Sequence, residues 1–264
     1  MHNLVGFNHQ IIPAETAFLS AISSAALYGR GIFTTVAIYN SKPFLWQKHW
    51  QRLIENSQKI GIHLSEFPEE TVENQLIEII IKNNFTCGRA RLTFFDESQT
   101  SVWQTSSERK TNLLIQTGDF RKIKNNLRLT ISPFRVNSTS PLIGVKSCNY
   151  LENILALEDA KTKGFDEAIR LNEKGEIVSA CLANLFWKKG VGIFTPSLET
   201  GCLKGTTREF VLENFTVEER KAELIELKKA DEIFLTSAGI EVVKAVVDFN
   251  TGNASKGERL KEKG

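Results

Sequence analysis

The stretch YGRGIFTTVAIYNSKPFLWQKHWQRL, residues 28–53, changes character halfway along. Its first part is rich in β-branched and aromatic residues, which is typical of a strand, and the Asn40-Ser41 pair predicts a turn into a second strand near Pro43. From Trp46 onward the apolar residues recur at helical spacing. The stretch therefore predicts a hairpin that runs into an amphipathic helix, which belongs to an α+β fold.

Outward from this stretch, the same patterns predict further strands and helices on both sides. A hairpin is expected over residues 1–12, and a second helix begins near Pro68. The later elements are expected to be the strands ARLTFF, TNLLIQT and LRLTISPF, the helix NYLENILALEDAKTKG with Asn149 as its N-cap, a hairpin of DEAIRL with IVSACLANLFW, the helix TREFVLENF, the strands DEIFLTSAG and VVKAVVDF, and a frayed tail, TGNASKGERLKEKG.

The polar, basic segment GDFRKIKNN divides the chain into two parts. It predicts a smaller α+β N-terminal domain over residues 1–117, a linker over about residues 118–123, and a larger C-terminal domain over residues 124–264. A surface loop inside one domain is the alternative for the same segment.

Composition excludes several classes of function. The formal net charge of +2 predicts no strong attraction to nucleic acid or to an anionic membrane. No apolar run is long enough to span a bilayer, and no signal peptide is expected. The cysteines and histidines are too scattered for a metal site or a disulfide framework, so we expect no metal and a reducing, cytoplasmic location.

Three segments carry residue types suited to an anionic ligand. Lys146 lies among apolar neighbours, where burial would lower the pKa of its amine and make it nucleophilic; the alternative is a solvated loop lysine. Thr206 and Thr207 stand at a helix start, where amides and hydroxyls suit a phosphate; the alternative is a capping box with Glu209. Arg52 lies on an apolar helix face and could reach a buried anion; the alternative is a snorkelling surface arginine.

These three features together are what pyridoxal 5'-phosphate requires. A lysine forms a Schiff base with its aldehyde, while an arginine and helix amides neutralise its phosphate. The sequence therefore predicts pyridoxal phosphate as the cofactor and a small molecule as the substrate.

Five segments, in order, resemble fold-type IV pyridoxal-phosphate enzymes, the class IV aminotransferase family. They are YGRGIFTTVAIYNSKPFLWQKHWQRL, SPLIGVKSCNYLENILALEDAK, GEIVSACLANLFW, FTPSLETGCLKGTTREFVLE and DEIFLTSAG. The resemblance covers roughly residues 3–250. It implies an α+β, two-domain architecture with the cofactor site between the domains and the Schiff-base lysine on the larger C-terminal domain. It also implies a homodimer in which a loop of the neighbour helps to close the pocket.

The resemblance implies roles for individual residues. Lys146 would be the catalytic lysine, forming the Schiff base and moving the substrate proton. The implied cofactor-binding residues are Arg52, Lys146, Ser179, Asn184, Thr206, Thr207, Ser237 and Ala238. Tyr28 and Thr34 are expected at the substrate, and Arg30, Arg91 and Arg135 are candidates for a substrate carboxylate, with surface or structural roles as their alternatives.

Some features depart from the family pattern. Arg30 replaces the acid of the common Y-G-D-G turn, the D-R pair before that turn is absent, and FFDESQTSVWQ stands where a Gly-rich segment is usual. These differences bear on substrate recognition more than on cofactor binding.

The largest departure is Ser179. The family places a glutamate five residues before the asparagine that matches Asn184, and that glutamate pairs with the pyridine nitrogen. Here the position holds Ser179, and in a regular strand Glu176 would point to the opposite face, so that only a bulge would bring it back. Because a serine hydroxyl only shares a hydrogen bond, we expect a largely neutral pyridine nitrogen.

Ser179 and the Phe33-Thr34-Thr35 segment favour one branch of the family. The Phe33-Thr34-Thr35 and CLANLFW segments resemble the lyase that converts 4-amino-4-deoxychorismate to 4-aminobenzoate and pyruvate in folate biosynthesis. Ser179 favours the same reaction because an elimination driven by aromatisation needs a strong electron sink less than amino transfer does. The alternative is an aminotransferase acting on branched-chain or D-amino acids. A second alternative is a cofactor-binding homologue without turnover, in which Ser179 marks lost activity.

Overall fold

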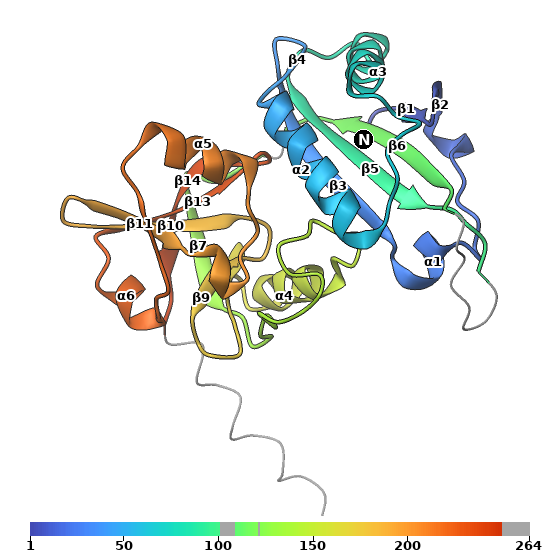
Figure 1. Ribbon diagram of the computed structural model, residues 1–264. Helices are drawn as coiled ribbons and strands as arrows, with labels where there is room; N and C mark the ends of the chain where they lie inside the picture. Colours follow the sequence, from blue (N-terminus) through green and yellow to red (C-terminus); the bar gives the residue numbers. More distant parts are fainter. Residues whose placement is uncertain (101–108, 121, 250–264) are drawn as a thin grey trace, which may run out of the picture. The chain divides into compact units, whose positions relative to one another are not determined.

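The computed structural model describes residues 1–100, 109–120 and 122–249 (Figure 1). The chain splits into two compact units. Unit one comprises Met1–Lys122 and Val145–Tyr150, and unit two comprises Ile123–Gly144 and Leu151–Gly264. The expected frayed tail, residues 251–264, lies outside the described residues.

Unit one is a six-stranded sheet with helices packed on it (Figure 1). Its elements are β1 (Leu4–Phe7), β2 (Gln10–Pro13), η1 (Ala14–Thr16), α1 (Ser24–Tyr28), β3 (Gly31–Tyr39), β4 (Lys42–Pro43), α2 (Trp46–Ile60), α3 (Glu69–Lys82), β5 (Gly88–Asp96) and β6 (Thr111–Gly118). The strand order is β2-β1-β6-β5-β3-β4, and every neighbouring pair is antiparallel. The two expected hairpins and the helices over residues 46–60 and 69–82 are confirmed.

The turns and the core of unit one follow from identifiable residues. Asn8, Asn40 and Ser41 adopt positive φ angles of 53°, 49° and 61°, which tight hairpin turns require. The apolar faces of α2 and α3 bury their side chains against the sheet. The core includes Ile32, Val36, Trp46, Trp50, Leu53, Leu76, Ile79, Leu92 and Phe94.

The lysine segment Val145–Tyr150 groups with unit one, although the sequence prediction places it in the C-terminal domain. The physical reason is backbone pairing: Phe33 N donates to Lys146 O at 2.9 Å, and Cys148 N donates to Gly31 O at 2.8 Å. The segment therefore borders β3 and is held by the start of that strand.

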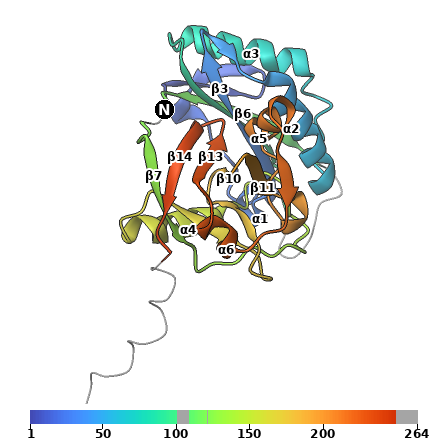
Figure 2. The same ribbon diagram turned by 90° about the vertical axis from the view of Figure 1, so that its left-hand side faces the viewer.

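Unit two is a mixed eight-stranded sheet. Its elements are β7 (Asn126–Ile131), α4 (Leu151–Thr162), β8 (Glu167–Leu171), β9 (Ile177–Ala180), β10 (Asn184–Lys189), β11 (Gly192–Pro196), η2 (Leu198–Thr200), α5 (Thr206–Asn214), β12 (Glu218–Arg220), α6 (Leu224–Lys228), β13 (Glu232–Ser237) and β14 (Glu241–Val247). The order is β12-β11-β10-β13-β14-β7-β8-β9, and Figure 2 shows β7, β14, β13, β10 and β11 side by side. Because β9 also contacts β10 and β11, the sheet curls around its core.

Two details of unit two differ from the sequence prediction. IVSACLANLFW is not one strand: Ala180 N donates to Ala183 O at 2.9 Å, which closes a turn between β9 and β10. Asn149 is not the cap of α4, because the helix begins at Leu151 and the Asn149 side chain donates instead to Gly29 O at 3.0 Å.

No helix within residues 1–100, 109–120 and 122–249 is long and apolar enough to cross a membrane.

Candidate active site

Lys146 lies among aromatic rings in unit one. Its Nζ is 4.4 Å from the centre of the Phe33 ring and 4.6 Å from that of Tyr150, and it donates to Tyr150 Oη at 3.3 Å. Burial, followed by repulsion from Arg52 and Arg91, holds the pKa of Lys146 well below its usual range. A lowered pKa makes the amine more nucleophilic, and the alternative of an ordinary solvated lysine does not describe a residue in this setting.

Arg52 is buried and takes part in a short chain of hydrogen bonds. Its Nη2 donates to Thr34 Oγ1 at 2.7 Å, and the same hydroxyl lies 2.6 Å from His49 Nδ1. Arg52 is 7% exposed, which rules out the alternative of a snorkelling surface arginine. Thr34 is fully buried, so its hydroxyl orients Arg52, whereas the sequence prediction expected it at the substrate.

His49 sits between the cations of this cluster. Burial, then repulsion by Arg52 and Lys146, holds its pKa well below the usual range. The ring is therefore neutral near pH 7, which leaves Nδ1 able to accept the Thr34 proton. The sequence prediction missed His49, although its position three residues before Arg52 on one helix face was a usable signal.

The depressed pKa of His49 predicts a pH dependence of stability. In the unfolded chain a histidine binds a proton below about pH 6.5, whereas folded His49 does not, so the free energy of unfolding should fall as pH drops through about 6.5. Urea unfolding of the apoprotein between pH 5.5 and 7.5 measures this slope. The slope should flatten in His49→Gln and persist in the control His63→Gln, since His63 is exposed. Equal slopes in the two variants would contradict the prediction.

The arginines proposed for substrate recognition separate in the structure. Arg91 lies beside the lysine, with its guanidinium carbon 3.7 Å from the centre of the Phe33 ring and its Nε donating to Thr93 Oγ1. Arg30 is half-buried in the turn after α1, next to the exposed Tyr28. Arg135 is exposed in unit two. Of the three, only Arg91 acts electrostatically on Lys146 in the described chain.

The second group of candidate residues forms a cradle in unit two, at the N-terminus of α5. Asn184 pairs across the sheet with Thr236, and its Nδ2 donates to Leu203 O at 2.8 Å. This anchors the loop that leads into Thr206 and Thr207. The helix is capped by Gly205 without a side-chain hydrogen bond, so the alternative of a capping box with Glu209 is wrong.

The β13 end of the same cradle holds Ser237 and Ala238. Ser237 Oγ accepts from Gly239 N at 3.3 Å, and Ile240 N donates to Ser237 O at 3.1 Å, so the turn after the strand is ordered. Contacts between α5 and β13 bring this turn and the helix start into one region.

Gly205 allows the close approach that forms the cradle. A Cβ added there would lie 2.0 Å from Asn184 Oδ1. We therefore expect Gly205→Ala to displace Asn184 and to lower the free energy of unfolding by about 1–3 kcal/mol. A urea titration checks this against Gly118→Ala, whose Cβ would meet nothing nearer than 3.6 Å. Equal midpoints for the two variants would count against a tight Gly205–Asn184 contact.

Ser179 is half-buried in β9, where a bulge interrupts the pairing with β8. Arg170 lies opposite Ser179, but the next pair is Leu171 with Ile177, so Val178 is the additional residue. The regular alternation assumed from the sequence therefore fails here. The Glu176 side chain is hydrogen-bonded within the turn before β9, where its Oε2 accepts from Asn172 Nδ2 at 2.7 Å.

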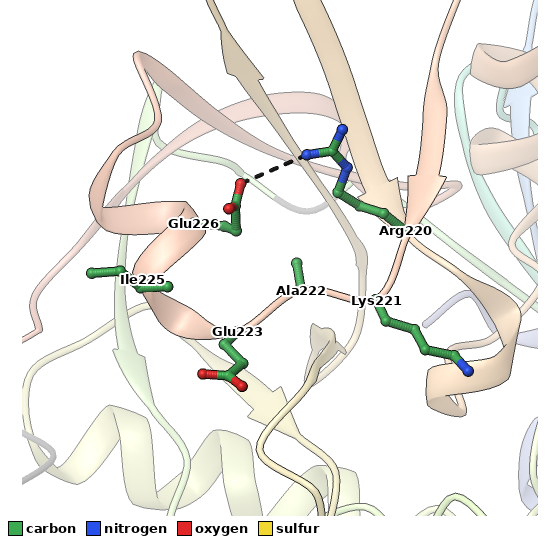
Figure 3. Close-up of a pocket in the computed structure, with 6 residues that line it drawn as sticks. All are labelled: Arg220, Lys221, Ala222, Glu223, Ile225 and Glu226. Atoms are coloured by element: carbon green, nitrogen blue, oxygen red, sulfur yellow. Dashed lines mark ion pairs between the residues drawn. The ribbon is translucent and has the colours of Figure 1, made fainter.

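A separate open pocket of about 420 Å³ lies beside β12 and α6 (Figure 3). It is lined by Arg220, Lys221, Ala222, Glu223, Ile225 and Glu226. Arg220 Nη1 and Glu226 Oε2 form an ion pair at 3.8 Å, and none of the candidate site residues lines this pocket.

Comparison with known proteins identifies the class to which this fold and these residues belong. The family profile "Amino-transferase class IV" matches residues 31–246, and the chain belongs to that family. It is an enzyme whose cofactor is pyridoxal 5'-phosphate.

The individual relatives and solved structures carry the names of two kinds of enzyme. The aminodeoxychorismate lyase of Bacillus subtilis is 27% identical over 263 residues, covering 96% of this chain and 89% of its own. A branched-chain aminotransferase from Thermoproteus uzoniensis, solved with norvaline, has a TM-score of 0.88 at 24% identity over 94% of this chain and 88% of its own. The 4-amino-4-deoxychorismate lyase of Pseudomonas aeruginosa has a TM-score of 0.81 at 22% identity, covering 92% of this chain and 91% of its own.

Proposed function

We propose that this enzyme is a lyase that converts 4-amino-4-deoxychorismate to 4-aminobenzoate and pyruvate, a step towards folate. The observation that carries the proposal is Ser179, which stands where the family places a glutamate, because an elimination driven by aromatisation needs a strong electron sink less than amino transfer does. The similarity to the Bacillus subtilis lyase over nearly the whole chain supports the same reaction.

The residues present fit pyridoxal phosphate. Lys146 offers an amine of depressed pKa beside two aromatic rings, and Arg52 offers a buried guanidinium. Thr206 and Thr207 begin a helix whose first turn has no room for a side chain at Gly205. We assign the phosphate to Arg52 and to the amides and hydroxyls of these threonines, with the turn at Ser237 and Ala238 contributing further donors.

When bound, pyridoxal phosphate supplies an aldehyde that condenses with amines and a conjugated ring that accepts electrons. Lys146 would hold the cofactor, and its Nζ, once released by the substrate amine, would be the base of the reaction. The freed Nζ then takes the proton from the substrate ring carbon that bears the amine. The C–O bond at the adjacent carbon breaks, its electrons leave with enolpyruvate, and the ring becomes aromatic; protonation of the enolpyruvate gives pyruvate.

We assign a substrate carboxylate to Arg91. Its guanidinium is stacked on Phe33 and so has a fixed orientation close to Lys146. Stacking fixes the plane in which the guanidinium can pair with a carboxylate. Tyr28, Arg30 and Arg135 remain weaker candidates for substrate contacts.

The decisive experiment is incubation of the holoenzyme with aminodeoxychorismate. Fluorescence of 4-aminobenzoate and a coupled assay for pyruvate should rise together in equal amounts. Amino transfer from branched-chain or D-amino acids to a 2-oxoacid, without 4-aminobenzoate, would instead identify an aminotransferase. Bound cofactor with neither activity would indicate a homologue without turnover.

We further propose that the enzyme acts as a homodimer. Apolar side chains gather on residues 18–28 of unit one and are at least 42% exposed: Phe18, Leu19, Ile22, Leu27 and Tyr28. An exposed apolar patch of this kind is typical of a protein interface. Light scattering should give a mass of twice the 29.7 kDa chain for the wild type. The double variant Phe18→Ser with Ile22→Ser should have the mass of a single chain. A wild-type mass of one chain would contradict the proposal.

The four free cysteines fit a cytoplasmic location.

A further inference from the structure

Arg170 is a buried charge in unit two. It lies on β8 and is 1% exposed. Its Nη1 donates to Asn153 Oδ1 on α4 at 2.5 Å, and its Nη2 is 3.6 Å from Glu152 Oε2. Glu152 is 80% exposed, so this ion pair is weakened by solvent and does not by itself account for a fully buried guanidinium.

Part of this guanidinium lacks a partner. Arg170 Nε is buried and has no hydrogen-bond acceptor among the described residues. Leaving a buried donor of a charged group unsatisfied is costly, so such an atom points to an acceptor supplied by a ligand.

The residue opposite Arg170 gives the position of that ligand. Arg170 and Ser179 are directly paired across β8 and β9, and side chains at paired positions point to the same face of a sheet. Ser179 has a short side chain where the family has a glutamate. The longer side chain of Arg170 can therefore reach the space next to the short side chain of Ser179.

We propose that Arg170 replaces the family carboxylate at the pyridine nitrogen, with its guanidinium donating a hydrogen bond to an unprotonated ring nitrogen. This inference rests on the proposed function, which places Ser179 beneath the pyridine ring. A guanidinium has donors only and stays protonated, so its partner has to be an acceptor. A neutral pyridine nitrogen is an acceptor, whereas a protonated one would repel Arg170.

The other charged groups around Arg170 are already engaged. Glu167, on the same strand, accepts from Leu182 N at 3.2 Å, and the Glu152 side chain is itself mostly exposed to solvent. Burial and Glu167 raise the pKa of Cys181 to about 12, while Arg170 acts in the opposite direction. Neither carboxylate has the position opposite Ser179 that Arg170 has.

The chemical consequence is a weaker electron sink. Without a proton on the ring nitrogen, charge built up on the substrate is withdrawn less strongly. Amino transfer requires that charge to persist until a proton arrives at another carbon. Elimination driven by aromatisation does not need the charge to persist for as long. Arg170 would therefore favour the lyase reaction over amino transfer.

The first test uses the full-length holoenzyme reconstituted with cofactor labelled with ¹⁵N in the ring. Borohydride should first fix the cofactor on Lys146; failure to bind or to be fixed would overturn the proposed function and this inference with it. In holoenzyme that has not been treated with borohydride, the ¹⁵N chemical shift should be that of an unprotonated pyridine throughout pH 6–9. A cofactor that is bound and fixed but has a protonated ring nitrogen would overturn the inference alone.

The second test exchanges the paired residues. Arg170→Leu with Ser179→Glu should yield a protonated ring nitrogen, because a carboxylate then faces it. Arg128→Leu is the matched control: Arg128 is exposed on the adjacent strand β7 and should leave the nitrogen unprotonated. If the exchanged variant keeps the ¹⁵N shift of the wild type, the paired positions 170 and 179 do not face the ring nitrogen and the inference fails.

A third measurement depends on binding alone. A cofactor analogue with CH in place of the ring nitrogen should bind the wild type about tenfold or more weakly than pyridoxal phosphate, because Arg170 loses its acceptor. The difference should shrink in Arg170→Leu. An equal affinity of the wild type for both molecules would overturn the inference.

Discussion

Lys146→Ala should abolish fixation of pyridoxal phosphate by borohydride and lower the rate of 4-aminobenzoate formation by about 10⁴-fold. The reason is that one amine both holds the cofactor and moves the substrate proton. Its depressed pKa, caused first by burial and then by Arg52 and Arg91, makes it ready for both tasks. Mass spectrometry after borohydride treatment and a single-turnover assay measure the two effects separately.

Two control variants make this result specific. Lys110 is in the same unit and 70% exposed, so Lys110→Ala should change neither quantity. Lys146→Arg keeps the positive charge but has no readily deprotonated amine, and should be as inactive as the alanine variant. Persistent borohydride fixation in Lys146→Ala would show that a different lysine holds the cofactor.

Arg52→Met should weaken binding of pyridoxal phosphate by about 10- to 100-fold, equivalent to about 1.5–3 kcal/mol for a hydrogen bond to a charged group. Thr34 fixes the orientation of the guanidinium, so Thr34→Val should produce a smaller loss in the same direction. Equilibrium titration of the apoprotein with the cofactor, followed by fluorescence, gives the dissociation constants.

A phosphate-specific role also predicts competition. Inorganic phosphate should compete with the cofactor in the wild type and much less in Arg52→Met. The control Arg89→Met removes an arginine that donates to Asp119 O in the same unit, and its affinity should remain unchanged. If Arg52→Met binds the cofactor as tightly as the wild type and only unfolds earlier, Arg52 is structural and the assignment is wrong.

Much of unit one could be predicted because its signals are local. Asn40 and Ser41 accept the positive φ angles of a tight turn, and the helix after them shows its period through Trp46 and Trp50. Arg52 stood out because a charge on an apolar helix face is unusual. These features depend on near neighbours in the sequence, so the sequence alone was sufficient.

Long-range pairing explains what the sequence could not provide. The turn at residues 181–183 lies in an apolar run, and its interruption depends on β10 pairing with β13, which lies far along the chain. The sequence did not single out Arg170, because its burial depends on Asn153 in α4 and on the bulge opposite it. Membership of the family was predictable from segment order, and the distinction between lyase and aminotransferase depends on such individual pairings.

The return of Val145–Tyr150 to unit one affects the order in which the protein can be completed during translation. When the ribosome has released Lys122, the edge of β3 that later receives Lys146 O and Cys148 N is still uncovered. Domains generally fold in the order of synthesis, but here the first unit must wait for residues made after part of the second. A nascent chain stalled before residue 145 should therefore be more open to proteases at β3 than one stalled well beyond residue 150.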